Sequence, residues 1–277
     1  FGAQDKQVMV QDNSVLHLTL DQEIADRGDK DQFDIDLGPF QGESKIGLNN
    51  ILASLENAKT DDHIEGIFLD LTSVGAGFAT MREIREKLLE FKRESGKPVV
   101  AWSESFSQGS YYLATAADAI YLQPMGDVDY RGLRSEYMFM KGMFQKLDID
   151  IQFIRGSNNK FKSFGETYTE DKMSPANQEQ IRMILDGLWA DHLAAVSAKS
   201  GVDGTRLNMI ADSLLVRNAE TAHELKLVDG LKYRDEVLDE LKERMGLPAD
   251  KDVRFAELRK YMKSFRSGSA KKGEGKL

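Results

Sequence analysis

The sequence predicts an α/β domain in which helices cover a mostly parallel β-sheet. Short apolar runs typical of buried strands recur between Val15 and Ile154. Amphipathic or small-residue segments typical of packed helices separate these runs, and Gly, Pro, Asn and Asp residues mark the junctions. Strands that alternate with helices pair in parallel, because a parallel pair needs a crossover connection that is usually a helix.

The first five elements follow this alternation closely. The continuous apolar run at 66–71 suits a parallel strand buried on both faces. The segment at 81–94 is amphipathic, and Ser95-Gly-Lys-Pro98 closes it because Gly and Pro end helices. In chain order we expect a strand at 15–20, a helix at 45–57, a strand at 66–71, a helix at 81–94 and a strand at 99–102.

The remaining elements continue the pattern with longer helices toward the end. The segment after Gly109 is small and apolar enough for a packed helix, and the following apolar run suits a strand that ends at Gln-Pro-Met-Gly. We expect a helix at 111–117, a strand at 119–122, a helix at 137–146, a strand at 151–154, one long helix at 176–198 and helical structure over 218–246.

The domain is expected to cover residues 1–250. Residues 251–277 contain nine basic and three acidic residues and end in Gly, Ser and Lys, which is the composition of a flexible linker. We interpret this segment as a basic linker toward a carboxy-terminal half that the 277 residues do not include. Position 1 is Phe rather than Met, so we also expect a processed or trimmed chain, with any anchor upstream.

Composition excludes several classes of protein. A net charge of −9 argues against nucleic-acid binding, which needs a basic face. The absence of cysteine excludes disulfides, thiolate zinc sites and cysteine nucleophiles. The four histidines are too scattered for a metal site, and no P-loop is present, so we expect no metal and no cofactor. No run approaches the roughly 18 apolar residues of a membrane-spanning helix.

Two candidate sites follow predicted strands, where α/β proteins hold ligands. Gly75 and Gly77 precede the helix at 81–94, and their backbone N–H groups could form an oxyanion hole or simply make a strand-to-helix turn. Ser107 and Ser110 flank the start of the helix after the strand at 99–102. They could be nucleophiles, but helix capping is the better interpretation because no base is recognisable nearby.

The third candidate is the polar loop after the strand at 151–154, which contains Lys160, Lys162 and Ser163. A loop lysine is normally solvated and protonated. To act as a general base it must be neutral, so burial must lower its pKa from about 10.4 toward 8, which costs roughly 3 kcal/mol. Composition alone does not support such a role for either lysine.

Five segments of the sequence, the last of them a weaker match, occur in a recognisable order. They are Ile67-Phe-Leu-Asp-Leu71, Ser107-Gln-Gly-Ser-Tyr-Tyr-Leu-Ala114, Phe161-Lys-Ser-Phe-Gly-Glu166, Asp171-Lys-Met-Ser-Pro175 and, more weakly, Ala222-His-Glu-Leu-Lys-Leu-Val-Asp229. The fourth segment precedes a long helix that bears Trp189. In this order the segments, which together span roughly residues 15–235, resemble the amino-terminal half of the long, two-domain form of the bacterial signal peptide peptidase A family.

The resemblance implies a Clp-protease/crotonase-like fold and a serine endopeptidase with a Ser/Lys dyad that degrades signal peptides left in the membrane after secretion. The family's lysine lies in a "YKS" motif, which matches Phe161-Lys162-Ser163, so Lys162 is the implied general base. Lys160 is not at the matching position. Ser163 could orient the lysine amine or be a plain loop hydroxyl.

The serine nucleophile of the family belongs to its carboxy-terminal half, in a "SGGY" motif. The equivalent stretch here is Gln108-Gly109-Ser110-Tyr111, so Gln108 stands where the nucleophile would be. Ser107 and Ser110 flank that position without occupying it. The family's "PGG" oxyanion turn is represented only by Val74-Gly-Ala-Gly77, which leaves Gly75, Gly77, Gln108 and Gly109 as candidates for substrate or oxyanion contacts.

The resemblance also implies partners and a location. They are cleaved signal peptides, the carboxy-terminal half of the same protein, further copies in a homo-oligomer such as a tetramer, and the membrane, with the domain on the periplasmic side of a bacterial inner membrane. Two other functions stay open: a non-catalytic scaffold half that grips peptide within the ring, and, with less support, a crotonase-type acyl-CoA enzyme. The scaffold differs in not needing Lys162, and the acyl-CoA enzyme differs in binding coenzyme A.

Overall fold

The computed structural model describes residues 9–27, 45–154, 156, 159–248 and 251–270. These residues form two compact units. Unit 1 comprises the chain up to Arg131 and again from Ala195, and unit 2 is Gly132–Ala194.

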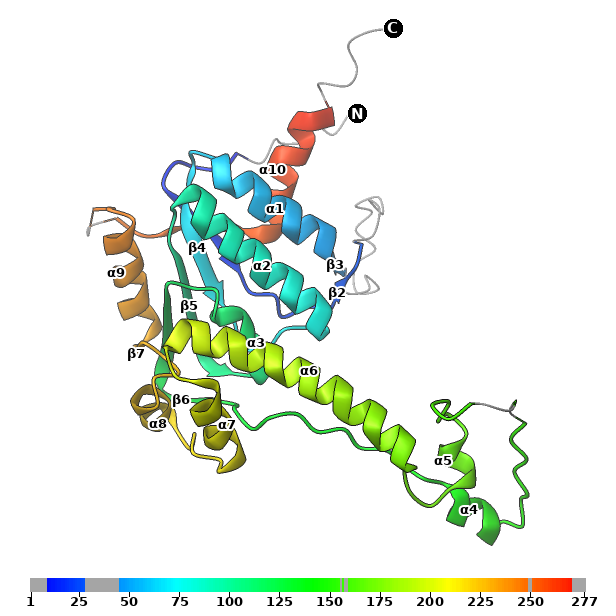
Figure 1. Cartoon of the computed structure of the whole chain (residues 1–277). Coiled ribbons are helices and arrows are strands. Elements are labelled where there is room, and N and C mark those ends of the chain that lie inside the picture. The colour runs from blue at the N-terminus through cyan, green and yellow to red at the C-terminus, as the bar shows by residue number, and fades with distance from the viewer. Residues whose placement is uncertain (1–8, 28–44, 155, 157–158, 249–250, 271–277) are drawn as a thin grey trace, which may run out of the picture. The chain divides into compact units, whose positions relative to one another are not determined.

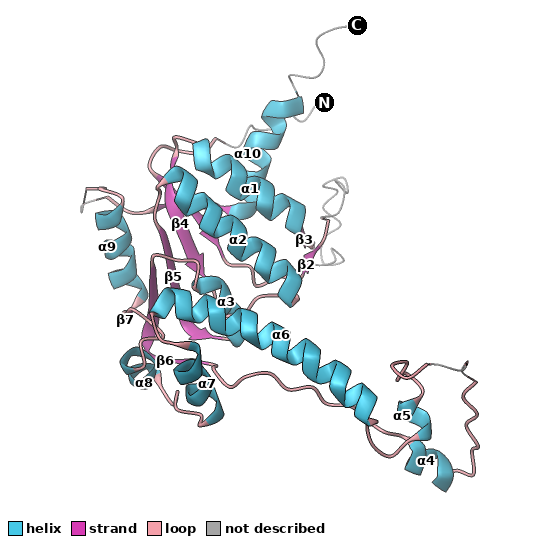
Figure 2. Ribbon diagram, in the orientation of Figure 1, coloured by secondary structure: helices cyan, strands magenta, loops and turns pink. Residues whose placement is uncertain are grey.

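A six-stranded parallel sheet forms the centre of unit 1. Figure 2 shows its strands in magenta, and their spatial order is β7-β6-β5-β4-β1-β8, with every neighbouring pair parallel. The strands are β1 (Ser14–Leu18), β4 (Ile64–Asp70), β5 (Val99–Phe106), β6 (Ala119–Val128), β7 (Gly230–Leu231) and β8 (Arg254–Glu257). Two short strands, β2 (Ile24–Ala25) and β3 (Ile46–Gly47), pair separately.

Helices cover both faces of this sheet. In Figure 1, α1 and α2 lie side by side over one face and α9 lies over the other. The α9 face has a core of Phe68, Val100 and Trp102 packed against Val237 and Leu241. The helices of unit 1 are α1 (Leu48–Thr60), α2 (Phe78–Ser95), α3 (Gln108–Ala114), α7 (Gly204–Asp212), α8 (Ala219–Glu224), α9 (Arg234–Arg244) and α10 (Leu258–Ala270).

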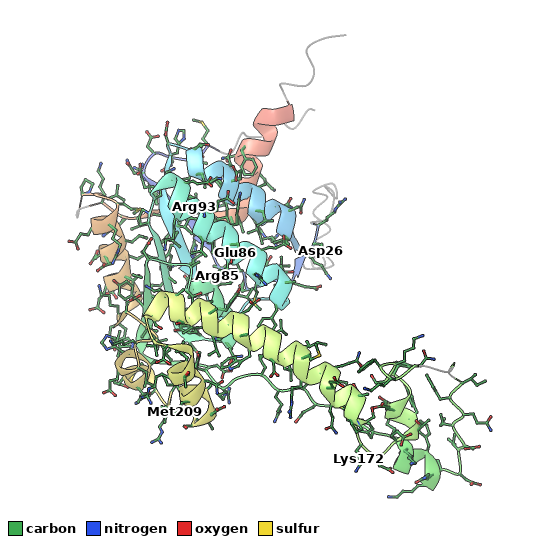
Figure 3. The ribbon with its side chains drawn as sticks, viewed as in Figure 1. Asp26, Arg85, Glu86, Arg93, Lys172 and Met209 are labelled. Atoms are coloured by element: carbon green, nitrogen blue, oxygen red, sulfur yellow. The ribbon has the colours of Figure 1, made fainter. Side chains whose placement is uncertain are left out.

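Buried contacts fix the helices of one face to each other. Arg85 of α2 is buried, and its Nε donates to Thr115 Oγ1 at 2.7 Å, just beyond α3 (Figure 3). Its guanidinium also lies 5.3 Å from the centroid of the Tyr112 ring.

Gly96 ends α2 in the left-handed conformation, with φ at 70°, and its N–H donates to Lys92 O. The predicted helix stop at Ser95–Pro98 is therefore confirmed.

Unit 2 contains two short helices and most of a long one. They are α4 (Lys141–Lys146), α5 (Glu166–Thr169) and α6 (Pro175–Ser200), the last turns of which belong to unit 1. Met140 N donates to Thr167 O at 2.7 Å, and the Phe144 and Tyr168 rings lie 6.2 Å apart between centroids. These contacts hold α4 against α5.

The predicted α/β class, a mostly parallel sheet covered by helices as the Clp-protease/crotonase-like resemblance implies, is confirmed. Two elements were predicted wrongly. The run at 151–154 forms no strand, because its apolar residues lie in unit 2 with no neighbouring strand among the described residues, and Ile154 is 97% exposed. The helix expected over 218–246 is interrupted by β7, where Gly230 lies against the Tyr121 ring.

The segment from residue 251 is only partly as expected. Residues 254–257 form β8, which pairs with β1, and residues 258–270 form α10. The Tyr261 hydroxyl donates to Asp61 Oδ2 and accepts from Asn57 Nδ2, which ties α10 to the end of α1. The linker interpretation therefore does not hold for these residues, and residues 271–277 lie outside the described ones. The domain limits themselves stay a prediction.

A buried histidine joins three strands of the sheet. His17 of β1 contacts Asp70 of β4 through Nε2, at 3.2 Å, and Glu257 of β8 through Nδ1, at 3.0 Å. Burial by itself lowers the pKa of His17, but the hydrogen bonds to both carboxylates outweigh it and raise that pKa. For the Asp70 carboxylate the signs are reversed. Burial by itself raises the pKa of Asp70, but the hydrogen bonds from His17 and Arg234 outweigh it and lower that pKa.

The pH dependence of stability follows from these directions. A histidine whose pKa is raised on folding stabilises the protein below its unfolded-state pKa of about 6.5, and this contribution disappears as the pH rises through the folded value. Asp70 stays ionised above pH 5 because its pKa is lowered from 3.8. His17→Gln should therefore lower the free energy of unfolding by about 1–3 kcal/mol at pH 5.5, and by less at pH 8.5.

Urea denaturation of both proteins between pH 5.5 and 8.5 measures this difference. His223→Gln changes an exposed histidine and serves as the control, with stability unchanged across the range. A difference for His17→Gln that stays constant with pH would contradict the assigned charge on the ring.

Candidate active site

The chain segments that follow β4 and β5 meet at the carboxyl edge of the sheet. Thr72 lies just beyond β4, and its carbonyl accepts from Ser107 N at 3.2 Å and from Ser110 Oγ at 3.0 Å. Parallel strands bring their carboxyl ends to one edge, so the two predicted strand-end candidates become neighbours.

The two serines cap a helix. Ser107 is the N-cap of α3, and its side chain accepts from Ser110 N at 3.2 Å. Ser110 is fully buried, with its hydroxyl between the carbonyls of Thr72 and Ser107. Neither hydroxyl has a lysine, histidine or carboxylate within hydrogen-bond distance among the described residues. The geometry therefore favours capping over a nucleophilic role.

Gln108 occupies the first position of α3. Its Oε1 accepts from the backbone N–H of Arg131 at 3.2 Å. Arg131 ends the first segment of unit 1, and this bond holds it against α3. An amide is not a nucleophile, so this position cannot supply one. Gly109 beside it is closely packed, because a Cβ there would lie 3.0 Å from the sulfur of Met81 on α2 and that side chain would have to shift slightly.

The two glycines after β4 have different surroundings. Gly75 N donates to Leu20 O at 3.3 Å and Gly75 O accepts from Ile24 N at 2.8 Å, so an oxyanion donor at Gly75 would first have to give up its bond to Leu20. A Cβ at Gly75 would lie 2.4 Å from Gln22 O. Gly77 is the N-cap of α2, with open space around its Cα, and its N–H has no acceptor among the described residues.

Lys162 and Ser163 lie in unit 2, in the loop before α5. Lys162 N donates to Asn159 O at 3.1 Å, while its side chain is exposed and forms no ion pair or hydrogen bond within the described residues. Lys160 differs, because its ammonium lies 3.9 Å from Glu179 and 4.8 Å from the centroid of the Phe161 ring.

Glu166 ends the Phe161–Glu166 motif, and the sequence assigns it no role. Glu166 is only 7% exposed, and its carboxylate accepts from Ser174 Oγ at 2.5 Å, from Ser174 N at 3.1 Å and from Asn177 Nδ2 at 3.0 Å. The available signal was its position eight residues before Ser174-Pro175, a sequence typical of a helix start. That signal predicts a cap but not the distant carboxylate that completes it.

The profile of the family described as peptidase family S49 matches residues 91–248, which is more than half of the chain. The chain belongs to peptidase family S49. The resemblance to signal peptide peptidase A is thereby confirmed at the level of the family, and the matched residues include α3, the Lys162 loop and all of α6.

Three curated relatives agree with the S49 assignment. Protease 4 of Salmonella typhi is 36% identical over 72% of the chain and 33% of its own length. The chloroplastic serine protease SPPA of Arabidopsis thaliana is 29% identical over 91% of the chain and 35% of its own length. Protease 4 of Haemophilus influenzae is 30% identical over 81% and 36%. The chain therefore spans about a third of the length of these relatives.

Two solved structures also resemble this S49 chain, each at 14% sequence identity. A membrane-bound stomatin-specific protease covers 76% of the chain with a TM-score of 0.44, and 89% of that protein is matched. An enoyl-CoA hydratase/carnithine racemase from Magnetospirillum magneticum covers 83% of the chain with a TM-score of 0.41, and 73% of it is matched.

The described residues contain neither a metal-binding cluster nor a membrane-spanning helix. No group of three or more His, Cys, Asp or Glu side chains is placed to hold a metal ion in the part of this S49 chain that the structure describes. Within the same residues, no helix has the length and apolar character needed to cross a membrane.

The contrast between the two glycines gives a test of their roles. Gly75→Ala should lower the free energy of unfolding by about 1–3 kcal/mol, because the added methyl group overlaps the backbone carbonyl of Gln22 and the segment must shift. Gly77→Ala should leave stability within about 0.5 kcal/mol, because no atom lies within 4 Å of the added carbon. Urea denaturation measures both, and equal stabilities for the two variants would contradict the close approach at Gly75.

Proposed function

We propose that this chain is the amino-terminal half of a Ser/Lys endopeptidase that degrades signal peptides, and that it supplies Lys162 as the general base. Membership of peptidase family S49 supports the class of reaction. The role of Lys162 and the need for a second half are argued from contacts within each unit and from the match to the family's lysine motif.

The state of Lys162 is the observation that carries the proposal. Of the two lysines in the loop, Lys160 already has an acidic partner and an aromatic ring beneath it, whereas the Lys162 amine contacts no acidic side chain or aromatic ring among the described residues. A general base must be able to lose its proton, and a carboxylate partner opposes that loss by favouring the charged form. Lys162 is therefore better suited to the role than Lys160.

In the proposed reaction the hydroxyl of a serine from the carboxy-terminal half attacks the carbonyl carbon of the peptide. The neutral amine of Lys162 takes the hydroxyl proton and delivers it to the leaving amine as the peptide bond breaks. Water then hydrolyses the acyl-enzyme with the same amine as base. Backbone N–H groups would stabilise the oxyanion, and Gly77 is a candidate in this half because its N–H has no acceptor among the described residues.

The exposure of Lys162 explains why a second half is needed. A neutral lysine at physiological pH requires burial, and the side chain is exposed in unit 2. The flanking rings of Phe161 and Phe164 are 46% and 75% exposed, so a partner that covers them would also remove water from the amine. The carboxy-terminal half, or a second copy of the chain, would supply that cover.

The apolar surface of unit 2 supports assembly into a homo-oligomer such as a tetramer. Large apolar side chains are usually scattered singly over a surface, but several lie within this unit of 63 residues. Met138, Phe153, Ile154, Phe164 and Met183 are each at least 42% exposed. Such a surface fits further subunits and apolar peptides, and association with the periplasmic side of a bacterial inner membrane would bring it close to cleaved signal peptides.

A scaffold role is the second candidate. It is favoured by the absence of a nucleophile at Gln108 and by the capping bonds of Ser107 and Ser110, which leave unit 1 without a reactive hydroxyl at the α3 start. On this alternative the chain would hold peptide and subunits together, and Lys162 would have no chemical task.

Lys162→Ala in the full two-domain protein should reduce hydrolysis of a fluorogenic apolar peptide by about 10²–10⁴-fold, because a positioned general base contributes that much. Lys160→Ala is the matched control, two residues away, and should change the rate by less than about threefold. In the 277-residue chain by itself, Lys162→Ala should leave the melting temperature unchanged, because that side chain is exposed there.

Activity in the Lys162 variant within a few fold of the parent would support the scaffold and rule out the base. The 277-residue chain alone should not hydrolyse the same peptide, because the proposed nucleophile belongs to the carboxy-terminal half. Hydrolysis by the chain alone would mean that Ser107 or Ser110 is the nucleophile after all.

A further inference from the structure

The loop that carries Lys162 is defined by two backbone turns. Lys162 N donates to Asn159 O at 3.1 Å, and Glu166 N donates to Ser163 O at 2.9 Å. The second turn leads directly into α5, so the backbone next to Lys162 and the first residue of α5 are joined by a hydrogen bond. A displacement of Glu166 is therefore passed to the residue that follows Lys162.

Glu166 is held from the side of α6. Ser174 precedes α6, and its Oγ accepts from Asn177 N at 3.2 Å in the manner of a helix N-cap. The Glu166 carboxylate accepts from the hydroxyl and the N–H of Ser174 and from the amide of Asn177, so it completes the start of a 26-residue helix. Figure 3 labels Lys172 in the chain segment that leads into this helix.

The loop is also fixed from its other side. A Cβ at Gly165 would lie 2.6 Å from the ring of Phe153, so glycine is required for the backbone to approach that ring. The Phe153 and Phe164 rings lie 6.3 Å apart between centroids, and the Phe164 and Tyr168 rings 6.0 Å apart. Residues 163–166 are thus clamped between an aromatic surface and the amino end of α6.

Burial of a carboxylate is costly, and an apolar side chain would fill the same space with less desolvation. The advantage of the carboxylate is directional. Three donors from two residues fix both of its oxygens, whereas apolar packing would let the loop slide. The Lys162 side chain is exposed and has no contact among the described residues that would hold it. The position of its loop must therefore be fixed by other residues, and the Glu166 carboxylate does this.

We propose that Glu166 is a positioning residue that fixes the Lys162 loop to the amino end of α6, so that the Lys162 amine meets the serine of the other half at a constant place. This inference rests on the proposed function, because it assumes that Lys162 is the base. It adds that the turnover rate depends on a buried carboxylate that touches neither substrate nor the reacting atoms.

The experiment compares Glu166→Ala and Glu166→Gln in the full two-domain protease, with Glu170→Ala as the control. Glu170 is an exposed carboxylate at the end of the same α5. The amount of folded, assembled protein is measured by size-exclusion chromatography, and kcat per folded molecule and KM are measured with a fluorogenic apolar peptide.

We expect Glu166→Ala to lower kcat per folded molecule about 10–100-fold with KM changed by less than about threefold, since small displacements of a catalytic group cost rate rather than binding. Glu166→Gln should recover part of the loss, because its amide oxygen still accepts. Lys160 and Glu179, the charged pair beside the loop, are retained in all variants.

A merely structural role gives a different result. Less folded protein, with the parent kcat per folded molecule, would overturn the proposal. If Glu166→Ala does not fold, Glu166→Gln decides: a loss of kcat per folded molecule of about three- to tenfold with KM within about threefold supports the proposal, and parent behaviour overturns it. Lys162→Ala in the same assay separates the two claims, because activity retained there overturns the proposed base, whatever Glu166 does.

Discussion

Coverage of both faces of the parallel sheet determines where this chain can present polar groups. All five residues of β1 are buried, and β4 and β5 are buried over most of their length. A polar side chain inside such a sheet needs partners of its own, as His17 has in Asp70 and Glu257. Groups that must stay accessible are therefore confined to the strand ends, which is where the segments after β4 and β5 come together through the carbonyl of Thr72.

Two charged side chains of the same loop in unit 2 have opposite environments. Glu166 is buried, and its carboxylate accepts hydrogen bonds from Ser174 and Asn177 of that unit. Lys162, four residues earlier, is exposed and receives no such support within the described residues. A catalytic lysine needs a dry environment that a small unit with an exposed apolar surface cannot provide alone. Division of the dyad between two halves would let assembly supply that environment.

The sequence predicted the sheet well because its signals are local. Apolar runs at 66–71 and 99–102 and the stop at Gly96 each depend on neighbouring residues, and each was found. The run at 151–154 misled because periodicity reports apolar character and not whether a partner strand exists. β8 was missed for the related reason that its pairing partner, β1, lies at the other end of the chain.

The same limit applies to the candidate site. Motif matching placed Lys162 and Gln108 without knowledge of their surroundings. It could not foresee that Gly75 donates its N–H to Leu20, or that Glu166 receives hydrogen bonds from residues eight and eleven positions later. Those contacts depend on where the loops lie in the folded chain, which residue types alone do not encode.

The pairing of β8 with β1 has a further consequence. His17 and its partner Glu257 are 240 residues apart, so during synthesis β1 has a neighbour on one side only until the ribosome has released β8. Contacts of such long sequence separation form slowly, because the entropy of closing the loop is lost before any contact repays it. Until then the side of β1 that pairs with β8 has no partner strand, and an unpaired strand edge can pair with another chain.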